Sequence, residues 1–151
     1  MATAISSETN LALSATVASL PGYKEVRNIF NSRVPGPYSA TITVGTEATN
    51  EIIVSLIIKD LYGNAVTQRT QVTLLLLADA NGDAFNAADY TIAAGTNGDL
   101  IQVTADKVIR AMTEANGTLD VSLTIVGAAT SYLAVVLATG RLSVSGAITH
   151  A

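Results

Sequence analysis

The chain has 151 residues, no cysteine and one histidine, and its 8 basic and 12 acidic side chains give a net charge of −4. This length suits one ordinary domain, and the lack of cysteine excludes disulfides and cysteine-based metal or nucleophile sites. The negative charge gives no electrostatic footprint for nucleic acid or for an anionic membrane, so neither is an expected partner.

The composition is also poor in charge. Charged residues make up 13% of the chain and hydrophobic residues 49%. An average domain has roughly 25% charged residues, so much of this surface must be small and polar, or must be covered. No apolar run approaches the ~20 residues of a membrane-spanning helix, and the N-terminal sequence lacks the features of a secretory signal. We therefore expect neither membrane insertion nor signal-dependent export.

Residues 1–38 are predicted to form an N-terminal arm. They hold all three prolines and carry three bases against two acids, whereas residues 39–151 lack proline and carry five bases against ten acids. Residues 24–32 have room for about two helical turns before the sequence Val34-Pro35-Gly36-Pro37 imposes an extended path. We expect an extended docking arm with room for a short helix at 24–32.

The arm concentrates side chains that favour protein interfaces. Aromatic and arginine side chains offer apolar area together with directed hydrogen bonds. In the arm these are Tyr23, Arg27, Phe30, Arg33 and Tyr38. Two interpretations stay open: the arm docks on neighbouring subunits, which we favour, or it folds on its own domain.

Residues 39–151 carry β-strand patterns throughout. Leu119–Ile125 alternates apolar and polar residues, the period-2 pattern of a half-buried strand. Five further segments have strand length and strand-type residues, namely 41–44, 52–58, 72–77, 132–137 and 142–145. Gly-Asn, Asn-Gly and Thr-Gly pairs separate the segments as tight turns. Short strands with regular turns predict an all-β sandwich over 39–151, in which 106–112 fits either a helical turn or an edge strand.

Candidate catalytic and metal-binding residues are few. His150 is next to last in the chain, and a solvated tail histidine cannot be held in a hydrolytic triad. Asp79, Asn81 and Asp83 have the spacing that opens a calcium loop, but Tyr90 stands where a bidentate acid is required. A plain turn with solvated acids is favoured, and these three residues are weak metal candidates. We expect no cofactor and no enzyme activity.

Three segments resemble the bacterial immunoglobulin-like repeats of invasin-type adhesins. Ile57–Val66 is similar to that family's strand followed by an aspartate and a glycine-asparagine turn, and Thr113–Leu123 to its acidic-x-asparagine-glycine turn and next strand. Gly127–Val135 resembles the strand whose tyrosine anchors a corner. The resemblance implies an immunoglobulin-like β-sandwich over about 40–150. Such domains also occur in tailed-bacteriophage virions, and the whole chain looks like a small virion structural or decoration protein.

Two predicted strands, 72–77 and 132–137, are apolar on both faces. If Val72, Leu74 and Leu76 fill the core, Leu75 and Leu77 point outward. We expect Tyr132, Ala134 and Val136 on the core side of the other strand, and the resemblance places both strands in one sheet. The sequence then predicts one outer patch covered by the arm or another subunit, formed by Leu75, Leu77, Leu133, Val135 and Leu137.

These observations lead to an expected function. The resemblance implies a non-enzymatic bacteriophage virion protein, foremost a capsid decoration (cement) protein on the outer surface of the head shell. Its partners would be the major capsid protein or other virion proteins, with homo-oligomers on the particle. It would be made in the bacterial host cytoplasm. The alternatives are a head-fibre, tail or baseplate module, or a carbohydrate or cell-surface adhesion module, which predicts an exposed aromatic cluster at one end of the sandwich.

Overall fold

The computed structural model describes residues 36–151, and residues 1–35 lie outside the described part. The helix expected at 24–32 lies outside it, as do the expected interface residues Tyr23, Arg27, Phe30 and Arg33. These expectations stay predictions.

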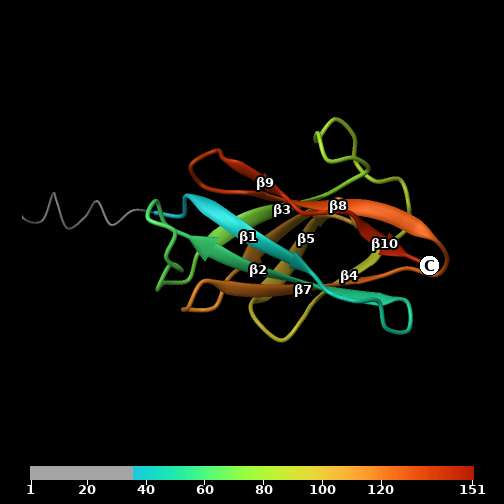
Figure 1. Cartoon of the computed structure of the whole chain (residues 1–151), viewed down its shortest axis with the longest axis horizontal. Coiled ribbons are helices and arrows are strands. Elements are labelled where there is room, and N and C mark those ends of the chain that lie inside the picture. Colours follow the sequence, from blue (N-terminus) through green and yellow to red (C-terminus); the bar gives the residue numbers. More distant parts are fainter. Residues whose placement is uncertain (1–35) are drawn as a thin grey trace, which may run out of the picture. The chain divides into compact units, whose positions relative to one another are not determined.

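Residues 36–151 form ten strands and no helix (Figure 1). The strands are β1 Ser39–Val44, β2 Glu51–Lys59, β3 Gln71–Leu77, β4 Thr91–Ala94, β5 Asp99–Thr104, β6 Val108–Met112, β7 Thr118–Thr124, β8 Ala129–Val136, β9 Leu142–Val144 and β10 Ile148–His150. The predicted all-β class is confirmed.

The strands form two antiparallel sheets that face one another (Figure 1). The first sheet has the order β1-β2-β7-β4, and the second has the order β10-β8-β3-β6-β5. The strand β9 also pairs with β8, at residues 134–136, whereas β10 pairs with residues 129–131. Immunoglobulin sandwiches pair strands A-B-E-D in one sheet and C, F and G in the other. Here β1, β2, β7 and β4 take the first four places, and β3, β8 and the β9–β10 pair take the other three. The fold is therefore an immunoglobulin-like β-sandwich, extended by β6 and β5 beyond β3.

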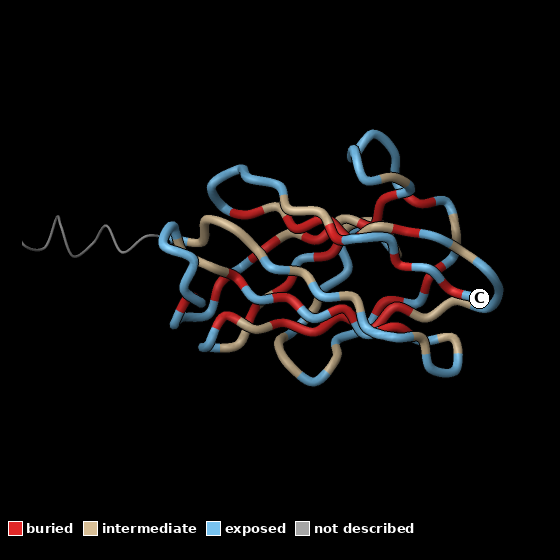
Figure 2. Tube along the Cα trace, viewed as in Figure 1, coloured by how far each residue is buried: buried red, intermediate tan, exposed pale blue. Residues whose placement is uncertain are grey.

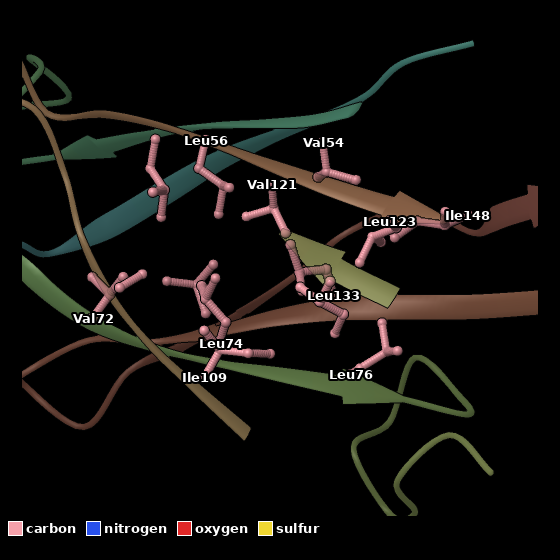
Figure 3. Close-up of a cluster of buried hydrophobic side chains, with 14 of the residues drawn as sticks. Val54, Leu56, Val72, Leu74, Leu76, Ile109, Val121, Leu123, Leu133 and Ile148 are labelled. Atoms are coloured by element: carbon pink, nitrogen blue, oxygen red, sulfur yellow. The ribbon is translucent and has the colours of Figure 1, made fainter. Parts of the chain in front are cut away.

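The apolar core fills the space between the sheets. In β2, Ile52, Val54, Leu56 and Ile58 are at most 2% exposed, while their neighbours along the strand point away. Successive strand residues point to opposite faces, so this alternation places one side of β2 in the core. Figure 3 shows Val54 and Leu56 pointing toward Leu74 and Leu76 of the other sheet. Figure 2 shows the buried positions along the strands and the exposed positions mainly in the loops.

The strand β7 is more buried than its alternating sequence predicts. Asp120 and Ser122 lie on its outer side, yet they are only 9% and 7% exposed. The Asn97 side-chain amide donates a hydrogen bond to Asp120 Oδ2 at 2.5 Å. The Ser122 hydroxyl donates to the carboxylate of Glu51. Polar neighbours from other segments therefore cover this outer side.

The orientation predicted for β8 is wrong. Leu133 pairs with Leu76 and Val135 with Leu74, and residues paired across antiparallel strands share a face. Leu133, Val135 and Leu137 are at most 2% exposed and belong to the core. The outer side instead carries Tyr132, Ala134 and Val136. Because both sides of this strand are apolar, alternation could not choose between them. The side that carries Tyr132 faces outward. A half-buried tyrosine on an outer face can keep its hydroxyl in contact with water.

Segment 106–112, left open between a helical turn and an edge strand, contains β6. This strand lies inside the second sheet, between β3 and β5. The sequence analysis did not predict β4, β5 or β10. They have four, six and three residues. In β5 only Leu100 is partly buried and the other residues are exposed, so the strand carries little of the alternation that marks a sheet face.

Candidate interaction surface on the second sheet

An apolar area lies on the outer side of the second sheet. The strand register places Val144, Ala134, Leu75 and Val108 in one row across β9, β8, β3 and β6. A neighbouring row begins with Leu142 and Val136 and continues with the polar residues Thr73 and Arg110, and another pairs Tyr132 with Leu77. The apolar residues among these are together named the apolar face: Leu75, Leu77, Val108, Tyr132, Ala134, Val136, Leu142 and Val144. Leu75 and Leu77 thus lie on the outer side as predicted, with partners from β8 that differ from those predicted.

The apolar face is only partly covered by the described chain. Ala134 is fully buried by its neighbours and Leu77 is 3% exposed, whereas Leu142 is 48% exposed. Leu75, Val108, Tyr132, Val136 and Val144 are half-buried. A side chain that is half-buried on an outer sheet face still offers apolar area to a partner.

The loop after β3 accounts for the burial of Leu77. Asn86 ties this loop to the second sheet, because its amide nitrogen donates to Leu76 O at 3.0 Å and its side chain donates to Thr130 O at 3.0 Å. A Cβ atom at Gly82 would lie 3.9 Å from Leu77 Cδ1 and 3.8 Å from Leu142 Cδ2. The loop therefore reaches over the apolar face between Leu77 and Leu142 and covers part of it.

Two shallow hollows lie beside the apolar face, one on each side of Gln71. The first, of about 300 Å³, is lined by Gln71, Val72, Thr73, Val136, Leu137 and Ala138. The second, of about 230 Å³, is lined by Gln71, Asp99, Ile101, Arg110, Ala111 and Met112. Ile101 belongs to β5 at the edge of the sheet and is 71% exposed. Thr73 and Arg110 lie between Val136 and Ile101 in the same row, so Ile101 is apolar surface separate from the face.

The chain enters the sandwich beside the same face. Tyr38 N donates to Lys59 O at 2.8 Å, and the Arg141 guanidinium lies 4.0 Å from the centre of the Tyr38 ring. The Thr139 hydroxyl donates to Pro37 O at 3.4 Å. Tyr38, an expected interface residue of the arm, therefore packs on its own sandwich at the β8–β9 turn. Of the five arm residues expected at an interface, it alone lies in the described part of the chain.

The expectation of a solvated His150 is wrong. The side chain is 1% exposed, and its Nε2 lies 3.2 Å from Leu123 O of the first sheet. Its ring meets the buried Tyr90 ring edge to face, with centroids 5.5 Å apart. His150 points inward because β10 pairs with β8, where Ile148 and His150 occupy alternate positions on the core side. It acts as a core residue that joins the two sheets.

Three polar atoms near this end of the core have no hydrogen-bond partner in the described chain. They are Tyr90 Oη, Ser131 Oγ and His150 Nδ1. Sequence reasoning missed this group because its members come from three separate strands or strand ends. Ser131 pairs with Ile148 in β10, which places it diagonally across from His150. All three atoms are buried, and the Tyr90 and His150 rings are in contact.

The weak metal candidates form a closed turn. Asp79 Oδ1 accepts hydrogen bonds from the main-chain amides of Asn81 at 2.7 Å and Gly82 at 2.9 Å. An aspartate that caps its own turn in this way has one oxygen already engaged. Within residues 36–151, no group of three or more histidine, cysteine, aspartate or glutamate side chains is placed to hold a metal ion. Nor does this part of the chain contain a helix long and apolar enough to cross a membrane.

No protein-family model and no curated protein sequence matches the chain. Among solved structures, it is similar to the cohesin module from Clostridium perfringens ATCC13124 family 33 glycoside hydrolase, at 16% identity and a TM-score of 0.39. The similarity covers 76% of this chain and 94% of that module. At this level the likeness carries no argument about function. The class of the protein, an immunoglobulin-like β-sandwich, rests on its own strand order.

Proposed function

We propose that the protein is a non-enzymatic structural protein of a bacteriophage virion, and that it decorates and cements the outer surface of the head shell. Its partners on the particle would be the major capsid protein and further copies of itself. The apolar face is the observation that supports this proposal. A sandwich that works alone in water is expected to have a polar outer side on each sheet, and on the second sheet the apolar face interrupts that side next to the polar residues Thr73 and Arg110.

The energetics of the apolar face favour association. Leu75, Val136 and Leu142 are large aliphatic side chains that keep part of their surface in water. Fully burying one such side chain contributes about 1.5–3 kcal/mol, so covering several of them would supply several kcal/mol of binding free energy. Many copies bound side by side on a shell would then stabilise it through a protein that contributes contacts rather than chemistry.

The adhesion alternative predicts an exposed aromatic cluster, and residues 36–151 show none. The most exposed aromatic side chains of the described chain are Tyr62 at 76% and Phe85 at 51%. Tyr62 lies in the loop before β3 and Phe85 in the loop after it, so the two stand at opposite ends of that strand. Sugar-binding sites use convergent groups within one concave site. This arrangement favours a surface that binds protein.

Labelling of particles tests the proposal. An antibody raised against residues 36–151 should decorate the heads of intact particles made by the phage that encodes the chain, as seen by immunogold electron microscopy. Label on tails, baseplates or head fibres would show that the protein belongs to that part of the virion and not to the head shell. The absence of label from every particle, with the protein present in the lysate, would contradict a virion function.

A further inference from the structure

The size of the apolar face limits what can cover it. Its eight residues form one row across four strands and two rows of two, which at about 4.8 Å between strands and about 6.7 Å between same-side residues amounts to roughly 260 Å². A stable interface between two globular proteins buries about 800 Å² on each partner. Two sandwiches placed face to face would therefore gain too little from this surface. A linear segment that covers the face and continues past its rim suits it better.

The chain itself contains a segment with suitable chemistry. Thirty-five residues precede the described part, and they include the aliphatic residues Leu11, Leu13 and Val17 and the aromatic residues Tyr23 and Phe30. Residues 20–35 carry Lys24, Arg27 and Arg33 against Glu25, while the sandwich carries five bases against ten acids. The apolar side chains of this segment suit the apolar face, and its net positive charge is opposite in sign to the net charge of the sandwich as a whole.

The point of entry into the sandwich lies at the rim of the face. Thr139, whose hydroxyl donates to Pro37 O, lies in the turn between Val136 and Leu142, two residues of the apolar face. An extended chain covers up to ~3.3 Å per residue, so 35 residues reach ~115 Å. Four strands at about 4.8 Å spacing span ~20 Å, so the segment is long enough to cross the apolar face of a neighbouring copy.

The residues just before β1 continue the line of that strand. Tyr38 N donates to Lys59 O, which continues the pairing of β1 with β2 beyond Ser39. Pro37 fixes its own φ angle and favours an extended Gly36 before it. Residues 36–38 therefore run in line with β1 of the first sheet.

We propose that the apolar face binds the N-terminal segment, residues 1–35, of a neighbouring copy, so that copies associate by exchanging these segments. This inference deepens the proposed function, because it names the contact by which copies join on the shell. It is tested on the purified protein without particles. Its failure is therefore distinguishable from failure of the virion proposal.

Sedimentation of the full chain tests the exchange. The full chain should associate reversibly, and the chain without residues 1–35 should remain monomeric at the same concentrations. The described residues contain their own core, so the shortened chain is expected to fold. Leu75→Ser with Val136→Ser should weaken association of the full chain at least tenfold. The matched control is Ile57→Ser, which changes a 38% exposed side chain on the outer side of the first sheet and should leave association unchanged.

Disulfide trapping distinguishes exchange from coverage within one copy. The chain has no cysteine, so every disulfide joins two introduced cysteines when Val17→Cys and Val136→Cys are made in two differently tagged copies, and the tags distinguish the mixed bond from bonds between like copies. A mixed disulfide between the two tags is expected. A double-cysteine chain that cross-links only within itself would overturn the proposal, as would association that survives removal of residues 1–35 or a full chain that is monomeric throughout.

Discussion

The main-chain amide of Ile58 donates a hydrogen bond to the carbonyl oxygen of Gly117, at 2.9 Å. This bond joins the end of β2 to the turn before β7. Gly117 has a φ of +78°, and a Cβ atom there would lie 2.9 Å from both Val66 Cγ2 and Val66 O. The two turn segments that resemble immunoglobulin-like repeats are therefore in direct contact, and glycine is required where they meet.

Substitution of Gly117 should show this requirement. Gly63 also has a positive φ, +85°, but nothing lies within 4 Å of a Cβ placed on it. Gly63→Ala should cost about 1 kcal/mol of unfolding free energy for backbone strain alone. Gly117→Ala should cost about 2–4 kcal/mol, because overpacking adds to the same strain. Urea denaturation measures both, and equal costs would show that Val66 moves aside freely.

The corrected orientation of β8 gives a second prediction. Leu133 is fully buried, while Val136 is half-buried on the apolar face. Leu133→Ser should lower the unfolding free energy by about 3–5 kcal/mol, through lost burial and a buried hydroxyl. Val136→Ser should cost about 1 kcal/mol or less. Thermal unfolding of residues 36–151 separates the two. If Val136→Ser lowered the unfolding free energy more than Leu133→Ser, Val136 and not Leu133 would face the core.

His150 should behave as a core residue in spite of its place near the end of the chain. His150→Ala removes the contact with the Tyr90 ring and leaves Leu123 O without this partner. We expect a loss of about 2–4 kcal/mol, against a change within about 0.5 kcal/mol for the exposed neighbour in Thr149→Ala. Chemical denaturation measures both variants. If His150→Ala left the unfolding free energy nearly unchanged, the ring would be in solvent and not in the core.

The hydroxyl of Tyr90 should contribute little, because it has no partner in the described chain. Tyr90→Phe keeps the ring and removes only the oxygen, so its unfolding free energy should stay within about 1 kcal/mol of that of the original chain. The same denaturation experiment measures it. A loss of 2 kcal/mol or more would mean that the hydroxyl is bonded, with a buried water molecule joining it to Ser131 and His150 as the natural explanation.

Calcium should not stabilise the turn that follows β3. Asp79 Oδ1 is engaged by the amides of Asn81 and Gly82, so binding a cation through it would compete with these bonds. Millimolar Ca²⁺, enough to fill even weak protein sites, should leave the melting temperature unchanged. Asp79→Ala should cost about 1 kcal/mol through loss of the turn bonds. A rise in melting temperature with Ca²⁺ that disappears in Asp79→Ala would establish a cation site.

The sequence by itself determined the strands whose two sides differ in chemistry. The alternation in Leu119–Ile125 predicted β7, and the Asn-Gly and Gly-Asn pairs predicted turns with positive φ at Gly63 and Gly117. These signals are local, because the period of a strand and the φ of a turn depend on adjacent residues. They were enough to predict an all-β sandwich.

Only the tertiary structure decided which side of a uniformly apolar strand faces the core. Leu133 and Ala134 are both apolar, and the choice between them depends on the register with Leu76 and Leu75 of a distant strand. The burial of His150 likewise depends on the pairing of β10 with β8. Burial is a property of what packs against a residue, so a pattern without contrast between its two sides carries no information about it.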